Sequence, residues 1–309
     1  MKKKITLIVK ITVSLVLIVY ALRSVDISAI LKAMQSARFY FILIALLLIA
    51  IGFIISALRW QILLKAQHID FSMFQLIKFY LVGSFFNNFL PTTIGGDIIR
   101  SYDVSKTSKS LAQSFAVIVV ERLTGLFAII TYAFAGLVFG YQTFGNITLV
   151  WLAGGIFFLI VITIILGVCL YGGKRIQTEK GGLGEKVKVK SNQLFNSLYL
   201  YKGKKKNLSY ALFLAFLLQF NVIVFFFIIA MALGLNPPFD YLLIIVPLIQ
   251  VILMFPLSIN GIGVRENAFI FFLSEIGITS TSSIALSWLS FALILIYALI
   301  GGLVYAFRN

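Results

Sequence analysis

Long apolar runs separated by short polar stretches dominate the chain. Several of the runs exceed the roughly 18 residues that a helix needs to cross the hydrocarbon core of a bilayer. In lipid such a run satisfies its own backbone hydrogen bonds as a helix. The pattern therefore predicts an all-α polytopic membrane protein, with residues 1–309 forming a single membrane domain. The runs fall near residues 5–22, 39–58, 72–90, 111–140, 147–171, 207–234, 240–256, 265–277 and 284–306.

Two stretches interrupt this pattern with proline, glycine and charged residues. The first runs from Asn88 to Arg100, and the second runs from Pro256 to Glu266. Irregular backbone at membrane depth persists only where protein or water satisfies its polar groups. Such breaks tend to mark the place where a membrane protein works. We therefore expect the functional residues at these two breaks.

Basic residues between the runs predict how the chain crosses the membrane. The long polar loop over residues 172–206 is rich in lysine and should be cytoplasmic, as should the N-terminus with its lysines at residues 2–4. Five single crossings before residue 172 would place that loop outside. One segment must therefore return to the side from which it came. Both flanks of residues 72–110 are basic, which predicts a re-entrant hairpin there that dips in from the cytoplasm. The basic residues are Arg59, Lys65 and Lys78 on entry and Arg100, Lys106 and Lys109 on exit.

A second hairpin follows from the loops that lack basic residues. The turns near residues 236–238 and 279–281 contain no lysine or arginine, so both should be external. Residues 240–277 would then dip in from outside and return. The prediction is about six full transmembrane helices plus two oppositely oriented re-entrant helical hairpins, with both termini cytoplasmic. The basic start followed by apolar residues also resembles a signal peptide, but the lack of a small-residue cleavage site favours a retained first helix.

Composition narrows the function. The net charge of +16 would indicate nucleic-acid binding in a soluble protein. Here 61% of the residues are hydrophobic and the basic residues lie in loops beside apolar runs, which indicates attraction to anionic lipids and no nucleic-acid partner. Cys169 is the single cysteine and His68 the single histidine. One cysteine excludes an internal disulfide and a thiolate metal cluster, and a single histidine argues against a zinc site, so we expect neither a metal nor a cofactor.

The first break combines backbone freedom with charge. Pro91 lacks an N–H group and disfavours helix in the residue before it. Glycines that follow can adopt positive φ, and the freed N–H groups of a new helix start can hold a phosphate. Asp97 can cap that helix, and Arg100 pairs well with phosphate. The alternative is an ordinary interfacial turn. The candidate substrate-binding residues here are Asn88, Pro91, Gly95, Gly96, Asp97 and Arg100.

The second break follows the same logic. Its glycines loosen the backbone, and a charged pair then opens the returning arm at membrane depth. Charges inside a membrane are costly and usually functional. The alternative is an Arg–Glu pair that locks the hairpin structurally. The candidate substrate-binding residues here are Ser258, Gly261, Gly263, Arg265 and Glu266.

A third charged element lies inside the apolar run 111–140. Glu121 and Arg122 are about 15 Å from the start of that run at 1.5 Å per residue, close to the midplane of a core about 30 Å thick. Adjacent helical residues point in directions about 100° apart, so these two are not simply partners of each other. We expect each to face a residue of opposite charge at one of the two breaks. A purely structural network is the alternative.

These three motifs, in this order and spacing, resemble the membrane domain of the bacterial lysylphosphatidylglycerol synthase/flippase family. The resemblance rests on Pro91 with Gly95-Gly96-Asp97 and Arg100, on Glu121-Arg122 with Gly125, and on Pro256 through Arg265-Glu266. The family often has Asp where Glu121 stands, and Gly-Gly where Asn260-Gly261 stands. The resemblance implies a lipid-handling membrane domain in a prokaryotic cytoplasmic membrane. It also implies that the aminoacyltransferase domain of two-domain members is missing after the last helix.

The resulting hypothesis is a lipid flippase-like transporter that moves a phospholipid or another lipid-linked headgroup between leaflets. Three arginines would hold the lipid phosphate, and three carboxylates would balance those charges or hold a cationic headgroup. The alternatives are a membrane transferase (lysylphosphatidylglycerol synthase-like, or acting on polyprenol-linked sugars) and an accessory subunit of such an enzyme. Membrane lipids are the expected partners; a homo-oligomer or a lipid-synthase partner stays open. The arginines are Arg100, Arg122 and Arg265, and the carboxylates are Asp97, Glu121 and Glu266.

Overall fold

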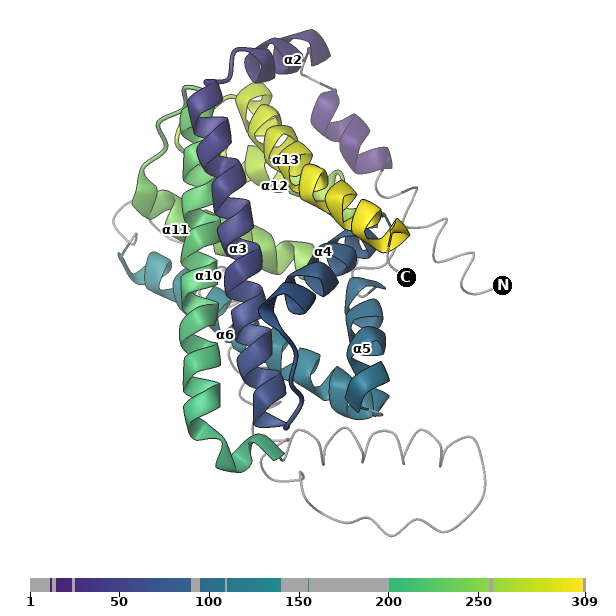
Figure 1. Cartoon of the computed structure of the whole chain (residues 1–309). Helices are drawn as coiled ribbons and strands as arrows, with labels where there is room; N and C mark the ends of the chain where they lie inside the picture. The colour runs from purple at the N-terminus through teal and green to yellow at the C-terminus, as the bar shows by residue number, and fades with distance from the viewer. Residues whose placement is uncertain are drawn as a thin grey trace.

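A computed structural model gives the structure of the chain. It describes residues 12, 15–23, 26–89, 95–108, 110–139, 155, 200–255 and 258–307. Within these ranges the regular elements are helices, as Figure 1 shows. Outside the described residues lie the predicted segment 147–171 apart from residue 155, half of the segment 5–22, and most of the basic loop 172–206.

Four of the helices are long and apolar enough to cross a membrane. They are α3 (Phe39–Ala66), α6 (Leu111–Phe139), α10 (Lys205–Ala232) and α13 (Ser280–Ala306). Helices α3 and α10 have 28 residues each, which is about 42 Å of helix at 1.5 Å per residue. The helical membrane architecture is therefore confirmed. The count of six spans stays a prediction, because half of one predicted span and nearly all of another fall outside the described residues.

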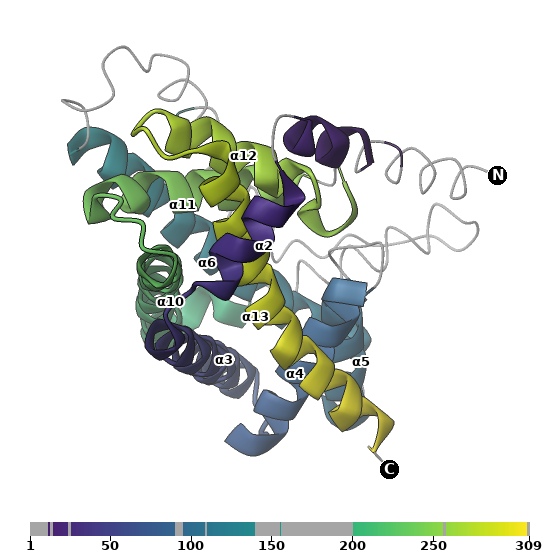
Figure 2. The ribbon, with the colours of Figure 1, turned by 90° about the horizontal axis from the view of Figure 1, so that it is seen from above.

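Four shorter helices occupy the two predicted hairpin regions. They are α4 (Met73–Phe89) and α5 (Gly95–Ser108) in the first, and α11 (Phe239–Met254) and α12 (Val264–Ser274) in the second. Each has fewer than the roughly 20 residues that a spanning helix needs. Helix α5 packs between α4 and α6, whereas α11 packs on α6 and α10, and α12 packs on α13 (Figure 2). In Figure 1, α5 lies at the level of the start of α10, and α12 lies at the level of its end. This placement fits hairpins of opposite direction, while their re-entrant insertion stays a prediction.

The spanning helices α3 and α10 run antiparallel and pack along their length. The backbone N–H of Arg38, just before α3, donates to the carbonyl of Ala232 at the end of α10 over 2.8 Å. At the same end lies the short helix α2 (Ile27–Gln35). Asp26 caps α2, and hydrogen bonds from the side chain and the backbone N–H of Ser28 hold the pKa of this carboxyl below its ordinary value. These contacts fix one end of the bundle.

Helix α3 extends further than the sequence pattern predicts. The apolar run was expected to end at residue 58, with Arg59 and Lys65 on the polar flank of the first hairpin. That placement of Arg59 is wrong: α3 continues to Ala66, and Arg59 is buried inside it. The helix continues because Trp60, Leu63 and Leu64 pack fully buried in a core shared with α4 and α6.

Helix α13 crosses α4 at backbone distance. A Cβ atom built on Gly301 would lie 1.9 Å from the carbonyl oxygen of Leu81, so only glycine fits there. A Cβ atom on the neighbouring Gly302 would meet the ring of Phe85 at 2.7 Å. Small residues at helix crossings allow this close approach in membranes. The crossing holds α4, and with it the first break, against the C-terminal helix.

Candidate functional site

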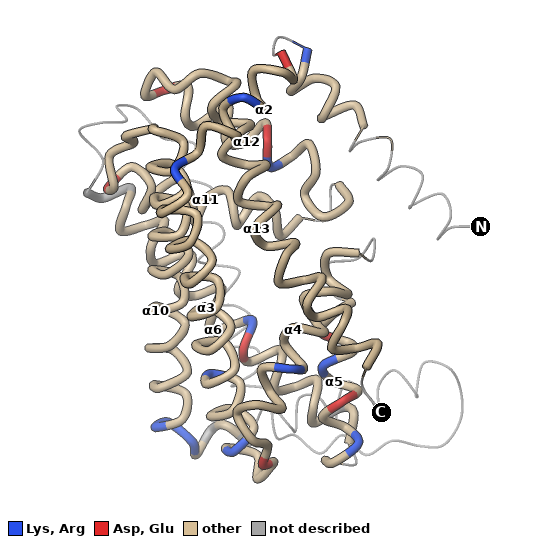
Figure 3. Tube along the Cα trace, turned by 45° about the horizontal axis from the view of Figure 1, so that its top comes forward, with Lys and Arg blue, Asp and Glu red and all other residues tan. Residues whose placement is uncertain are grey.

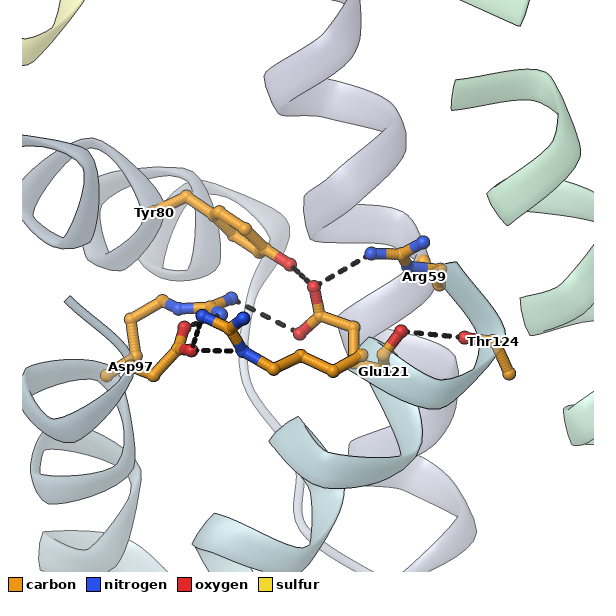
Figure 4. A network of polar contacts seen from close by, with 7 residues as sticks. Arg59, Tyr80, Asp97, Glu121 and Thr124 are labelled. Atoms are coloured by element: carbon orange, nitrogen blue, oxygen red, sulfur yellow. Dashed lines mark hydrogen bonds and ion pairs between the residues drawn. The ribbon is translucent and has the colours of Figure 1, made fainter. Parts of the chain in front are cut away.

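Glu121 lies at the centre of a buried network formed by α3, α4, α5 and α6 (Figure 4). Its Oε1 accepts hydrogen bonds from Arg59 Nη2 at 3.0 Å and from the hydroxyl of Tyr80. Its Oε2 accepts from Arg100 Nη1 at 3.2 Å. The side chain is 5% exposed. Two guanidinium groups and a phenol thus compensate one carboxylate that is removed from water.

Asp97 joins the other two arginines of this network. Its Oδ1 accepts from Arg100 Nη2 at 2.6 Å, and its Oδ2 accepts from Arg122. Asp97 is 3% exposed at its side chain, whereas the side chain of Arg122 is 47% exposed. Arg100 therefore bridges both carboxylates, while Arg122 extends the network toward the surface.

Aromatic rings cover the guanidinium group of Arg100. Its Cζ lies 4.1 Å from the ring centroid of Tyr80 and 4.9 Å from that of Trp60. Cation–π contacts of this kind stabilise a desolvated cation by about 2 kcal/mol. Tyr80 thus contributes twice, through its ring to Arg100 and through its hydroxyl to Glu121. Neither Tyr80 nor Trp60 was among the predicted site residues.

The start of α5 is held tightly against α4, which places Asp97 and Arg100. The backbone N–H of Gly96 donates to Asn87 Oδ1 over 2.7 Å. A Cβ atom on Gly96 would lie 2.1 Å from the carbonyl oxygen of Gly83, so the two helices touch through glycine backbone. Gly95 is buried beside it. The glycine pair therefore serves close approach, one of the two roles that the sequence suggests for it.

The second break carries a separate polar network. Arg265 donates from Nη2 to Glu266 Oε1 at 3.0 Å and from Nε to Ser287 Oγ at 2.9 Å. Ser287 also donates to Glu266 Oε1, and Glu266 Oε2 accepts from the backbone N–H of Gly263 at 2.6 Å. The guanidinium of Arg265 lies 4.3 Å from the ring centroid of Phe291. This network ties the start of α12 to α13.

The backbone ahead of α12 needs flexible residues. Asn260, Gly261 and Gly263 all have positive φ, at 50°, 74° and 82°. Ser258 is buried, and its Oγ has no hydrogen-bond partner in the described part of the chain. Asn260 Nδ2 donates to Asn88 Oδ1 at 3.1 Å, which connects the second break to the first. Pro91 lies outside the described residues.

The structure thus divides the predicted site residues between two networks. It pairs Glu121 with Arg100, and Arg122 with Asp97, as expected for charges facing the first break. Arg265 and Glu266 pair with each other and with Ser287, which is the geometry of the locking alternative. Figure 3 draws the charged positions of α12 apart from those of α5. The hydrogen bond between Asn260 and Asn88 links the two breaks.

Arg59 is the charged residue of the network that sequence reasoning missed. Its guanidinium reaches Glu121 from the side opposite Asp97 (Figure 4). The signal for it was present, because Arg59 precedes a further apolar stretch with Trp60, Ile62, Leu63 and Leu64. Extending the helix through that stretch would have placed Arg59 inside the membrane.

Comparison with known proteins identifies the family. The family model described as "Lysylphosphatidylglycerol synthase TM region" matches residues 7–302. The chain belongs to this family. It is also similar to a UPF0104 membrane protein of Pyrococcus horikoshii, with 25% identity over 289 residues that cover 86% of this chain and 85% of the relative. A UPF0104 membrane protein of Methanothermobacter thermautotrophicus is 24% identical over 273 residues, covering 82% and 80%. The resemblance predicted from the three motifs is therefore confirmed.

This member of the lysylphosphatidylglycerol synthase transmembrane-region family builds its polar networks from arginine, carboxylate and hydroxyl groups. Across the described ranges, no group of three or more His, Cys, Asp or Glu side chains is arranged to hold a metal ion. The chemistry available in the first network is ion pairing. Its three guanidinium groups suit the recognition of an oxyanion.

Proposed function

We propose that the protein moves a phosphate-bearing lipid between the leaflets of the membrane. The observation that carries this proposal is the pairing of Arg122 with Asp97. The half-exposed guanidinium of Arg122 is held by the buried carboxylate of Asp97, just after a helix break. The long helices around this pair are apolar enough to cross a bilayer. Intramembrane charges of this kind tend to mark a substrate pathway.

The pairing allows an exchange of partners. A lipid phosphate carries oxygen acceptors similar to those of a carboxylate, and arginine binds both. When Arg122 turns from Asp97 to a phosphate, Asp97 keeps its bond to Arg100 at 2.6 Å. No carboxylate is then left without a cation, which keeps the exchange low in cost. In this proposal the acyl chains stay in the bilayer while the headgroup passes the network.

The other predicted residues take supporting roles in this proposal. Glu121 fixes Arg100, the two glycines bring α5 against α4, and Asn88 positions the second break. Arg265 and Glu266 hold α12 to α13 through Ser287. Ser258, Gly261 and Gly263 shape the backbone that leads into this pair. Movement would be downhill or driven by an ion gradient, because the sequence has no P-loop for ATP.

The proposed setting is the cytoplasmic membrane of a prokaryote, with both termini on the cytoplasmic side. Basic residues at the end of α3, the end of α5 and the start of α10 support that orientation: Lys65, Lys106, Lys205 and Lys206. The transferase alternative needs a carboxylate that can accept a proton. Both oxygens of Asp97 and of Glu121 already accept hydrogen bonds from donors of the network, which favours transport over transfer.

The test is headgroup translocation by the full chain in proteoliposomes. A fluorescent phosphatidylglycerol would be quenched from outside, and the rate of its exposure measured. Arg122→Ala should slow translocation about tenfold, because it removes one charge-assisted contact of roughly 1.5 kcal/mol. Lys106→Ala is the matched control, since it also removes a half-exposed cation that pairs with a buried carboxylate, but the carboxylate is Asp103, outside this network.

Each outcome is informative once unfolding midpoints show that the variants are folded. The proposal is supported if Arg122→Ala translocates the lipid more slowly than wild type and Lys106→Ala translocates it at the wild-type rate. Equal rates for wild type and both variants contradict it. Mass spectrometry of the same vesicles separates the alternatives, because a transferase changes the mass of the lipid whereas a transporter leaves it unchanged.

A further inference from the structure

Arg59 has hydrogen-bond donors that the protein does not use. Its side chain is 7% exposed, and Nη2 donates to Glu121 Oε1. The Nε and Nη1 atoms are buried and have no hydrogen-bond partner among the residues that the structure describes. These two atoms carry three N–H groups, and a guanidinium has no way to lose its charge inside a protein. An unpartnered, buried and charged donor is costly, so the position calls for an acceptor.

Gly125 leaves room beside the unused Nη1. A Cβ atom on Gly125 would lie 3.4 Å from Arg59 Nη1 and 3.9 Å from Nη2. A residue larger than glycine would therefore place its side chain against the guanidinium group of Arg59. Gly125 is itself partly exposed, whereas Arg59 is buried. A side chain at this partly exposed position of α6 would thus reach the buried Nη1 of Arg59.

The charge count of the network points to the kind of acceptor. Three guanidinium groups, of Arg59, Arg100 and Arg122, are matched by the two carboxylates of Asp97 and Glu121. Within the described residues, Arg59 shares the carboxylate of Glu121 with Arg100 and is paired with no carboxylate of its own. A phosphodiester carries one negative charge and several oxygen acceptors. It would supply both the missing charge and the missing acceptors.

We propose that Arg59, reached past Gly125, is a binding site for a phosphate oxyanion in addition to Arg122. The site lies on the side of Glu121 opposite Asp97 (Figure 4). This inference deepens the proposed function and rests on it for the choice of a lipid as the natural source of the phosphate. Inorganic phosphate offers the same chemistry, so the experiment separates the two sources.

The experiment measures ligand-induced stabilisation of the purified full chain in detergent. The probes are short-chain phosphatidylglycerol, the diacylglycerol with the same chains, and inorganic phosphate. Arg59→Lys keeps the charge and can still reach Glu121, but it loses the guanidinium donors. Gly125→Ala leaves Arg59 intact and fills the space before it. Gly203→Ala is the matched control, because a Cβ atom there meets nothing within 4 Å.

For wild type and Gly203→Ala we expect phosphatidylglycerol to raise the unfolding midpoint and diacylglycerol to leave it unchanged. Arg59→Lys and Gly125→Ala should each weaken the apparent affinity about tenfold. If inorganic phosphate gives the same shift with the same variant dependence, the oxyanion site stands and its source is free phosphate. Equal affinity of wild type and Gly125→Ala overturns the site, even where Arg59→Lys fails to fold. Equal shifts from diacylglycerol and phosphatidylglycerol also overturn it.

The result is separate from the outcome of the translocation test. Loss of binding in Gly125→Ala with no translocation by the wild type would retain the anion site and reject the transporter. Translocation that depends on Arg122, together with unchanged binding in Gly125→Ala, would retain the transporter and reject the site at Arg59.

Discussion

Asn260 and Asn88, 172 residues apart in the chain, are joined by a hydrogen bond of 3.1 Å between their side-chain amides. Asn88 in turn donates to the carbonyl of Ser84 one helical turn earlier. The bond therefore links the backbone turn before α12 to the last turn of α4. Two breaks that the sequence places far apart are in contact through these amides.

Replacing Asn260 tests this contact together with the backbone that presents it. Asn260→Gly keeps the φ of 50° accessible and removes the hydrogen bond, which should cost about 1 kcal/mol. Asn260→Ala removes the bond and also places a Cβ in the left-handed region, which adds roughly 1 kcal/mol. Thermal unfolding in detergent should rank wild type above Asn260→Gly, and Asn260→Gly above Asn260→Ala. A double-mutant cycle with Asn88→Ala should show coupling, and additive effects would mean that the bond contributes nothing.

Removing the charge of Glu121 should be more damaging than removing its neutral partner. Glu121→Gln leaves Arg59 and Arg100 without the carboxylate that both share, and breaking a buried ion pair costs about 3–5 kcal/mol. Tyr80→Phe removes one hydroxyl donor and keeps the ring over Arg100, so it should cost about 1 kcal/mol. The unfolding midpoints of the two variants measure the difference. A Tyr80→Phe variant as unstable as Glu121→Gln would contradict the central role of the carboxylate.

The two polar networks should contribute to stability independently. Ser287→Ala removes a hydroxyl that donates to Glu266 and accepts from Arg265, and the expected loss is about 1–2 kcal/mol. Because Ser287 shares no partner with Tyr80, the double variant Tyr80→Phe/Ser287→Ala should lose the sum of the two single losses within about 0.5 kcal/mol. Strong coupling in this cycle would show that the networks act as one unit.

Adjacent glycines on α13 provide an internally matched pair. Gly301→Ala places its methyl group 1.9 Å from the backbone oxygen of Leu81, and neither helix can yield without separating. Gly302→Ala meets the ring of Phe85 at 2.7 Å, and a side chain can rotate away. We expect Gly301→Ala to lower the unfolding midpoint strongly, or to prevent folding, and Gly302→Ala to lower it by a smaller amount. Equal midpoints would contradict the backbone contact between α4 and α13.

The sequence predicted the elements of this fold better than the partners of its charges. Apolar runs located all four long helices, and the Pro and Gly positions located the breaks between α4 and α5 and between α11 and α12. A buried arginine is missed, however, when the first charged residue is taken as the end of an apolar run. Arg59 was therefore assigned to a flank, although α3 continues through it.

Pairing between charges depends on packing that periodicity does not encode. The pattern along α6 indicated that Glu121 and Arg122 point in different directions, and the structure directs them to Arg100 and Asp97. The role of Tyr80 in the network could not be predicted, because nothing in the sequence distinguishes it from the many other aromatic residues. Its position follows from the glycine contact between Gly83 and Gly96, which brings α4, α5 and α6 together.

In the proposed transport, the contact between Gly301 and Leu81 also affects where a lipid could reach the interior. At this crossing the two helices touch through their backbones, so no acyl chain can pass between them there. A lipid that reached Arg122 with its tails still in the membrane would therefore approach away from this crossing. One glycine would thus give the proposed transporter a point that is closed to lipid entry.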